Sequence, residues 1–376
     1  MKEFLARKGE AYTNINIDRM PRLWRERGNR FFLPKIIHII GTNGKGSTGR
    51  ILAKFLVDHG FKTLHYSSPH IFDINERFWL NGADITDDEL NKAHLDTLKT
   101  IGEELADELS YFEYATAIAA TLLRGCDYGV IEAGLGGEYD ATAVLPASLM
   151  LVTPIGYDHQ AILGESIEAI ASTKLRAARS PTIIAKQNSA RVYEIAARIV
   201  KERGFELFRA EDISPGIKEF TDNKAPPFMA INRQLAFAAA VFLGLNPSVS
   251  AFLINPLLGR MTQIAPNITI DAGHNLSAAE AVREAFGDKQ AHLIYNCFQD
   301  KPFGRILETL KPIIKDVLIL RLTHPRAARE EELLNAAKGL GVGCSYFNGR
   351  LEEGELYLVF GGFGVIEAFL RAYGAR

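Results

Sequence analysis

The chain has 376 residues, of which 47% are apolar and 23% charged, and its 43 Lys and Arg residues against 45 Asp and Glu leave a net charge of −2. This composition excludes a disordered chain, and the length predicts about two domains of roughly 150 residues each. The balanced charge excludes a general attraction to nucleic acid or anionic membranes, so any phosphate binding must be local.

The cysteines and the apolar segments bear on the cellular compartment. Cys126, Cys297 and Cys344 show no Cys-x-x-Cys spacing, which argues against a disulfide framework and a zinc site. The first residues lack the apolar segment of a signal peptide, and the longest apolar run, Leu235 to Leu245, is too short to span a bilayer. We therefore expect a cytoplasmic protein without membrane or nucleic-acid partners, and a monomer by default.

Strand-like and helix-like segments alternate over the first two-thirds of the chain. The β-branched run Lys35–Gly41 predicts a strand, and the apolar spacing over Gly46–His59 predicts a helix. The segments predicted next are a strand at Thr63–Ser68, helices from Thr86 and from Phe112, strands at Tyr128–Ala133 and Leu149–Ile155, a helix at Ser166–Ala178, a strand at Pro181–Ala185 and a helix at Ala190–Arg203. Nearly all-apolar strands between helices indicate a parallel sheet covered on both faces.

A break with Pro256, Gly259 and Pro266 falls at Ile254–Pro266, which we interpret as an interdomain linker. The alternation then resumes, with strands predicted at Ile268–Asp271, His292–Asn296, Val317–Leu320 and Leu356–Phe360, and helices from Ser277, from Phe303, from Ala327 and after Gly361–Gly362. The predicted fold is α/β, with a doubly wound, mostly parallel sheet domain over residues 1–257 and a smaller Rossmann-like α/β domain over residues 264–376.

The strongest motif is a glycine-rich loop between a strand and a helix. It reads Gly41-Thr42-Asn43-Gly44-Lys45-Gly46-Ser47-Thr48. Glycines let backbone N–H groups turn toward a phosphate, and the helix N-terminus adds a positive dipole end. Lys45 is placed to reach the terminal phosphates, and the hydroxyl of Ser47 to meet Mg²⁺. A plain strand–helix turn is the structural alternative, but three glycines, a lysine and two hydroxyls favour nucleotide binding.

Polar residues follow two further strands of the expected sheet. Glu132 opens the run Glu132–Gly137, and Tyr157-Asp158-His159 follows the strand at Leu149–Ile155. Because ligands bind at the carboxyl ends of parallel strands, Glu132 and His159 are candidates for a Mg²⁺ site, although histidine is an unusual ligand for a hard cation. A turn-capping carboxylate and a surface histidine are the structural alternatives.

Four other polar residues are weaker candidates. By helical position alone, Lys174 is expected to be a solvated lysine. Arg260 in the linker, and Asp271 and His274 in the Asp-Ala-Gly-His-Asn run, lie where a cleft would be, with a linker charge and an Asx turn as alternatives. His274 is a candidate general base on its chemistry.

Together these motifs resemble the folylpolyglutamate synthase/dihydrofolate synthase family of the Mur-ligase superfamily. The matching stretches, in the family's order, are GTNGKGST (41–48), YSSPH (66–70), SYFEYAT (110–116), VIEAGLGGEYDAT (130–142), TPIGYDH (153–159), LLGRM (257–261) and DAGHN (271–275). The resemblance implies a P-loop-type, ATP-binding first domain and a Rossmann-like glutamate-ligase second domain, with ATP and substrate between them.

The resemblance also implies roles for individual residues. Those implied to contact ATP are Thr42, Asn43, Gly44, Lys45, Gly46, Ser47, Thr48, Asn232, Arg260 and Asp271. The implied ligands of two Mg²⁺ ions are Ser47, Ser68, Glu132 and His159. The implied pterin-side pocket comprises Ser110, Tyr111, Phe112, Glu113, Tyr139, Asp140 and Ala141. Lys174 matches a lysine that is often carbamylated in the family, which reverses the expectation from its helical position.

The implied activity is an ATP-dependent amide ligation. A carboxylate of dihydropteroate or a reduced folate would attack the γ-phosphorus of ATP, and the amine of L-glutamate would attack the resulting acyl phosphate. Lys45, Lys174 and His274 are the expected catalytic residues. The alternatives are a Mur-type ligase acting on a UDP-linked cell-wall precursor, a P-loop NTPase without ligase activity, and a catalytically dead homologue.

Overall fold

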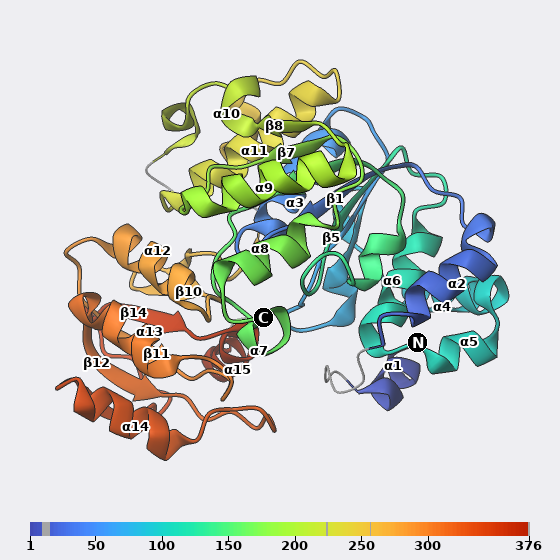
Figure 1. The fold of residues 1–376 in the computed structure, drawn as a ribbon. Helices are drawn as coiled ribbons and strands as arrows, with labels where there is room; N and C mark the ends of the chain where they lie inside the picture. Colours follow the sequence, from blue (N-terminus) through green and yellow to red (C-terminus); the bar gives the residue numbers. More distant parts are fainter. Residues whose placement is uncertain (10–15, 223–224, 256, 375–376) are drawn as a thin grey trace. The chain divides into compact units, whose positions relative to one another are not determined.

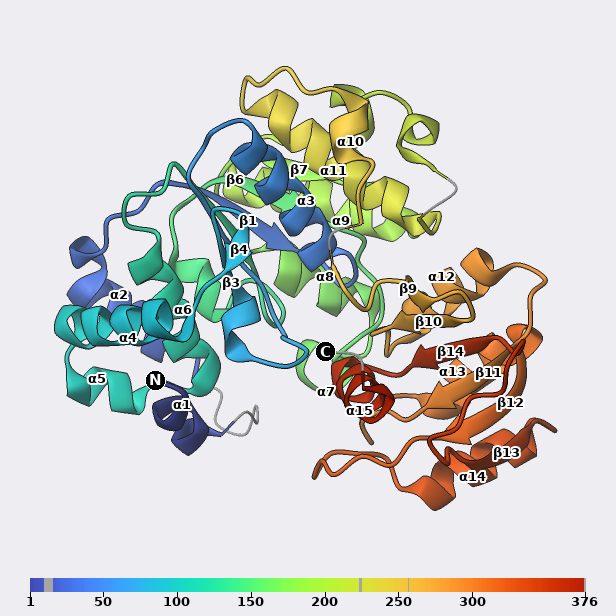
Figure 2. The ribbon, with the colours of Figure 1, turned by 180° about the vertical axis from the view of Figure 1, so that it is seen from behind.

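Two sheets organise the chain in the computed structural model, which describes residues 1–9, 16–222, 225–255 and 257–374. Each sheet belongs to its own compact unit (Figures 1 and 2). The first unit comprises Met1–Phe220 and Ile231–Ile254, and the second comprises Thr221–Ala230 and Asn255–Arg376. Pro256, which belongs to the segment expected as a linker, lies outside the described residues.

The sheet of the first unit has the order β4-β3-β2-β5-β1-β6-β7-β8. Its strands are β1 (Lys35–Ile40), β2 (Thr63–Tyr66), β3 (Phe78–Leu80), β4 (Ala83–Asp84), β5 (Tyr128–Glu132), β6 (Ala147–Val152), β7 (Thr182–Ile184) and β8 (Leu207–Arg209). The pairs from β2 to β8 are parallel, whereas β3 and β4 add an antiparallel edge. The carboxyl ends of β2, β5, β1 and β6 therefore meet at one edge.

Helices cover both faces of this sheet because its central strand is apolar on both sides. In β1 every residue after Lys35 is buried. Ile36 and Ile40 point to one face, where they join cores built with α6, α8 and α9, and Ile39 lies against Gly49 of α3 on the other face. The expected doubly wound, mostly parallel arrangement is confirmed.

The helices of the first unit follow the predicted alternation. They are α1 (Lys2–Lys8), α2 (Arg19–Arg27), α3 (Lys45–Asp58), α4 (Asp87–Ile101), α5 (Glu103–Glu108), α6 (Tyr111–Leu122), α7 (Gln160–Leu163), α8 (Ile167–Leu175), α9 (Ala190–Arg203) and α10 (Ala210–Ile213). Helix α11 (Phe228–Phe242) begins in the second unit and continues into the first. The 3-10 turns are η1 (Gly28–Arg30), η2 (Ile74–Arg77), η3 (Ala141–Val144), η4 (Ile217–Phe220) and η5 (Val249–Phe252).

The second unit repeats the pattern on a smaller scale, with the sheet order β13-β12-β11-β14-β10-β9. Its strands are β9 (Thr262–Ala265), β10 (Ile268–Asp271), β11 (Ala291–Tyr295), β12 (Ile314–Ile319), β13 (Gly343–Tyr346) and β14 (Tyr357–Phe360). Its other elements are α12 (Leu276–Phe286), α13 (Phe303–Leu310), η6 (Lys311–Ile313), α14 (Glu330–Gly339) and α15 (Phe363–Tyr373). All pairs are parallel except β9 with β10, as expected for a Rossmann-like unit.

The structure differs from the sequence predictions at several places. Thr262–Ala265, inside the segment expected as a linker, forms strand β9. The helix expected from Ala327 begins at Glu330. The edge strands β3 and β4 and the N-terminal helices α1 and α2 were not predicted. The two strands have only three and two residues, whereas Met20, Leu23 and Trp24 in α2 do follow a helical spacing. Among the described residues, no helix is long and apolar enough to cross a membrane.

Candidate functional site

The glycine-rich loop joins β1 to α3 and rests on the segment that follows β6. The backbone N–H groups of Thr42 and Asn43 donate to the carbonyl of Pro154 at 3.0 and 3.3 Å. Gly44 has φ +90°, and a Cβ there would lie 2.2 Å from Oδ1 of Asn232. The loop therefore requires glycine at this position, and it brings the predicted ATP-contact residue Asn232 of α11 against it.

Lys45 lies beside the carboxylate of Glu132 at the end of β5. Its Nζ is 3.8 Å from Oε1 of Glu132 and donates to the carbonyls of Gly41 and Thr42 at 3.4 and 3.3 Å. The other oxygen, Oε2 of Glu132, accepts from the backbone N–H of Ser68 at 3.2 Å. The buried carboxylate of Glu132, at the end of β5, is thus contacted by Lys45, which follows β1, and by Ser68, which follows β2. Such contacts are expected because the carboxyl ends of parallel strands lie at one edge of the sheet.

Two hydroxyls in the first turn of α3 are buried without a hydrogen-bond partner among the described residues. They are Oγ of Ser47 and Oγ1 of Thr48, in side chains 1% and 0% exposed. A buried hydroxyl without a partner is unfavourable, so it indicates a missing ligand. A hydroxyl close to a phosphate-binding type of loop is a suitable ligand for Mg²⁺. This ion prefers oxygen ligands, and phosphates and water usually fill several of its coordination positions.

The protein does not supply a complete metal cage. Within the described ranges, no three His, Cys, Asp or Glu side chains come together in a way that could hold a metal ion. Ser47 and Glu132 are the donors that fit, in keeping with an ion carried largely by a nucleotide.

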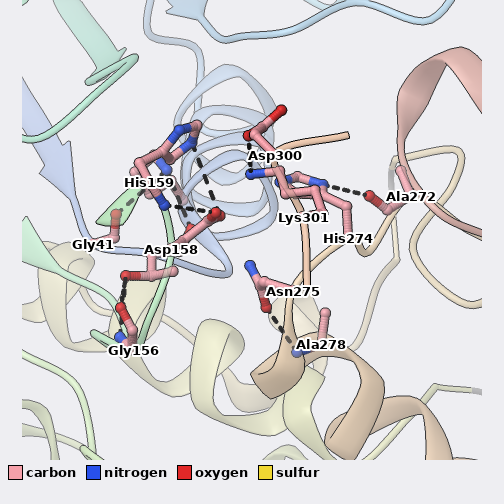
Figure 3. A network of polar contacts seen from close by, with 12 residues as sticks. Gly41, Gly156, Asp158, His159, Ala272, His274, Asn275, Ala278, Asp300 and Lys301 are labelled. Carbon is pink, nitrogen blue, oxygen red and sulfur yellow. Dashed lines mark hydrogen bonds and ion pairs between the residues drawn. The ribbon is translucent and has the colours of Figure 1, made fainter. Parts of the chain in front are cut away.

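His159 follows β6 and has a left-handed backbone, with φ +52°. Its Nε2 lies 3.9 Å from Oδ2 of Asp158, and its backbone N–H donates to Oδ1 of the same residue at 2.9 Å (Figure 3). The Asp158 carboxylate therefore fixes the backbone at His159 and lies beside its imidazole. Its metal role stays a prediction.

Lys174 on α8 is 4% exposed, so the interpretation as a solvated helix lysine is wrong. Its Nζ donates to the carbonyl of Gly41 at 2.9 Å, which places the amine at the start of the glycine-rich loop. Burial, and then the charge of Lys45, lower the pKa of Lys174 to about 7. The periodicity gave no sign of this, because the covering residues come from other parts of the chain.

Phe112 of α6 lies over the Gly134 backbone at the end of β5. A Cβ at Gly134 would be 2.6 Å from the Phe112 ring, and this ring stacks on Tyr66 with centroids 6.0 Å apart. The partly buried Phe112 thus offers an aromatic face at the edge of the sheet where Glu132 ends its strand.

Asp140 organises the loop between β5 and β6. Its Oδ2 accepts from the N–H of Leu135 at 2.8 Å, and its Oδ1 accepts from the N–H and the hydroxyl of Thr142 at 2.9 and 2.5 Å. Because Thr142 donates to Asp140, its oxygen accepts from Nε2 of His38 in β1 at 2.7 Å. Burial raises the pKa of Asp140 and lowers that of His38 to about 4. The sequence analysis missed His38 and Thr142.

Ser110 and Glu113 form a capping box at the start of α6. The N–H of Glu113 donates to Oγ of Ser110 at 3.4 Å, and the N–H of Ser110 donates to Oε2 of Glu113 at 2.7 Å. The Ser-x-x-Glu spacing is a readable signal of this structural role. Glu113 also pairs with Nε of Arg19 at 2.9 Å. Of the other predicted pocket residues, Tyr139 is 60% exposed and Ala141 begins η3.

The second unit holds its own group of predicted residues. Asp271 ends β10 and accepts from the N–H groups of Met261 and Gly273 at 2.8 and 2.7 Å, and burial raises its pKa. The Arg260 guanidinium lies 4.8 Å from the centre of the Phe363 ring. Nδ1 of His274 donates to the carbonyl of Ala272 at 3.1 Å (Figure 3).

Comparisons with known proteins agree with this geometry. No protein-family model matches the chain. The dihydrofolate synthase/folylpolyglutamate synthase of Escherichia coli is 30% identical over 337 residues, which cover 83% of this chain and 78% of that protein. The crystal structure of Helicobacter pylori folylpolyglutamate synthetase is 38% identical, with a TM-score of 0.77 over 100% of this chain and 98% of that one. Escherichia coli FolC in complex with DHPP and ADP is 25% identical, with a TM-score of 0.84 over 100% and 97% of the chains.

Proposed function

The chain belongs to the dihydrofolate synthase/folylpolyglutamate synthase family of ATP-dependent ligases, and from this premise we propose which groups it joins and which residues act. The acid is dihydropteroate or a reduced folate, and the amine is L-glutamate. The carboxylate of the acid attacks the γ-phosphorus of ATP and releases ADP. The glutamate amine then attacks the acyl phosphate, which gives an amide and phosphate.

The observation that carries this proposal is the approach of Lys45 to Glu132 at the end of the sheet. The Lys45 ammonium lies against the glycine-rich loop and 3.8 Å from Glu132. The same first turn of α3 carries the buried Ser47 hydroxyl, which has no hydrogen-bond partner among the described residues. The N–H groups in the first turn of α3, which have no intrahelical acceptor, and the dipole of this helix orient the phosphates. Lys45 neutralises the charge that develops on the transferred group. A bound Mg²⁺, held through Ser47 and Glu132, would supply Lewis-acid stabilisation of the phosphate oxygens.

Lys174 has the properties of a lysine that reacts with CO₂. Carbamylation needs the neutral amine, whose nitrogen attacks CO₂ and releases one proton to solvent. Burial lowers the pKa of Lys174 to about 7, so the neutral amine is well populated near that pH. The carbamate would place a negative charge beside the start of the glycine-rich loop, where Nζ of Lys174 now donates to the carbonyl of Gly41. We include this carbamylation, and the second Mg²⁺ with Ser68 and His159 as ligands, in the proposal.

The residues of the second unit have roles that follow from their chemistry. His274, whose ring is positioned by the contact of Nδ1 with the carbonyl of Ala272, is proposed to accept the proton of the glutamate amine. Arg260 and Asp271 are proposed to contact ATP.

The test is phosphate release from MgATP and L-glutamate with 7,8-dihydropteroate, with tetrahydrofolate or with no acceptor. Release that needs both glutamate and an acceptor is expected, and the acceptor that supports it separates the synthase reaction from tail extension. Lys45→Ala should lower this release by about 100- to 1000-fold. Lys54→Ala, on the same helix with its lysine paired to Asp58 at 2.9 Å, should not change it.

Two results would refute the proposal. Release that requires neither acceptor nor glutamate would indicate a simple NTPase. Absence of release with both folate acceptors, but turnover of a UDP-linked cell-wall precursor, would indicate a different Mur-type ligase.

A further inference from the structure

Arg77 is a buried arginine that the activity described above does not use. It ends η2, directly before β3, and is 7% exposed. Its backbone carbonyl accepts from the N–H of Ser67 at 3.0 Å. Because Tyr66 pairs with Phe78 across the sheet edge, this contact fixes Arg77 beside the end of β2.

The guanidinium contacts an imidazole and an aromatic ring. Its Nε donates to Nδ1 of His70 at 2.9 Å, and its carbon lies 5.1 Å from the centre of the Tyr111 ring. In the part of the chain that the structure describes, neither Nη atom has a hydrogen-bond acceptor, and no carboxylate forms an ion pair with the group. Although the side chain as a whole is only 7% exposed, its Nη atoms keep contact with solvent, so a ligand that brings negative charge can reach them.

His70 orients the guanidinium and does not compete with its charge. Nδ1 of His70 accepts from Nε of Arg77 and therefore carries no proton. The four Nη hydrogens of Arg77 remain for another group. The Tyr111 ring holds one face of the planar guanidinium.

Arg77 belongs to the same edge of the sheet as the site described above. One residue beyond Ser67, the N–H of Ser68 donates to Glu132 at 3.2 Å. Tyr111 directly precedes Phe112, whose ring covers Gly134 at the end of β5. An acceptor molecule that stacks on Phe112 and reacts near Lys45 would extend along this edge.

We propose that the guanidinium of Arg77 binds a carboxylate of the acceptor substrate, with Tyr111 and His70 holding its plane and direction. This inference rests on the proposed function. A planar guanidinium suits a carboxylate, because two parallel N–H groups can donate to its two oxygens. The carboxylate has two possible sources, the reacting group of dihydropteroate or a tail carboxylate of a folate.

The first experiment measures steady-state constants for wild type, Arg77→Gln, Arg77→Lys and the control Arg124→Gln. Arg124 is a matched control because its exposed guanidinium lies 4.7 Å from the Phe32 ring, in a similar stacking arrangement. Arg77→Gln should raise the KM for the acceptor about 10- to 100-fold, since hydrogen bonds to charged groups have that effect. Arg77→Lys keeps the charge but loses the planar pair of donors, so a smaller rise is expected. The KM for ATP should stay within about twofold in every variant.

The acceptors identify the source of the carboxylate. A rise for both dihydropteroate and tetrahydrofolate assigns the reacting carboxylate, whereas a rise for tetrahydrofolate alone assigns a tail carboxylate. A second measurement compares dissociation constants for dihydropteroate and its carboxamide in the presence of ADP. Wild type and Arg124→Gln should prefer the carboxylate, and Arg77→Gln should bind both alike.

Unchanged acceptor KM values in Arg77→Gln and Arg77→Lys would overturn the inference, as would an undiminished preference for the carboxylate. If Arg77→Gln loses the thermal transition of wild type, the kinetic constants of Arg77→Lys decide whether the inference holds. An equal rise of the KM for ATP and of the KM for the acceptor in Arg77→Lys also overturns the inference. A wild-type enzyme without activity toward either acceptor refutes the proposed function, and this inference with it. An active wild type with unaffected variants refutes the inference alone.

Discussion

Replacing Ser47 with alanine should separate activity from stability. The Ser47 hydroxyl is 1% exposed and has no hydrogen-bond partner among the described residues. The burial of this hydroxyl therefore opposes folding. Its place in the first turn of α3 makes its oxygen a proposed ligand of the Mg²⁺ ion that accompanies the nucleotide. Ser47→Ala is expected to lower kcat/KM for ATP by about 100-fold and to leave the fold intact.

The size of the stability change follows from the lost desolvation penalty. An unsatisfied buried hydroxyl costs about 1–3 kcal/mol, and alanine removes it while opening only a very small space. The variant without ligand should thus melt at the same temperature as wild type or about 2–4 °C higher, as expected for 1 kcal/mol in a domain of roughly 150–250 residues. Added MgATP should raise the melting temperature of wild type more than that of the variant.

Differential scanning fluorimetry and initial rates at several Mg²⁺ concentrations test this prediction. The control is Thr97→Val, because the Thr97 hydroxyl is buried but bonded to the carbonyl of Ala93 at 2.7 Å and to Thr121 at 2.8 Å. Thr97→Val should lose about 1–3 kcal/mol of stability and keep its activity. A Ser47→Ala protein that melts several degrees lower than wild type, or that keeps full activity, would refute the reasoning.

Two further predictions concern Lys174 and Thr142. The pKa of Lys174 in the folded protein, about 7, is below its ordinary value of 10.5, so between these pH values the unfolded chain binds more protons and stability rises with pH. In CO₂-free buffer, the free energy of urea unfolding should rise from pH 7 to pH 9 in wild type but not in Lys174→Met. An equal change of this free energy with pH in both proteins would contradict the prediction. With ¹³C-labelled bicarbonate, a carbamate carbon signal is expected in wild type alone. Thr142→Val removes a hydrogen-bond donor to Asp140 and the acceptor of His38, so it should lower the free energy of unfolding in urea by about 2–4 kcal/mol. A decrease of less than about 1 kcal/mol would show that this chain of hydrogen bonds is not stabilising.

Local patterns were readable wherever the chemistry lies in consecutive residues. The run from Gly41 to Thr48 between a strand and a helix predicted the loop geometry, since glycine conformations and a helix start depend on neighbouring residues. The run of four isoleucines in β1 predicted a buried parallel strand, because the apolar side chains need cover on both faces of the sheet. The resemblance of several motifs in a fixed order was enough to indicate the family, which the comparisons confirmed.

The sequence by itself thus determined the α/β fold class, the phosphate loop and the family, because these depend on local conformation and on motif order. Only the tertiary structure decided the environments of side chains. Lys174 looks solvated by helical position, yet it is buried against Gly41, a loop residue 133 positions away in the chain. Arg77 has no period or motif of its own, and its buried, unpaired charge arises from η2, α6 and the segment after β2 together. Burial and charge compensation are properties of residues brought together from distant segments, and spacing along the chain does not contain them.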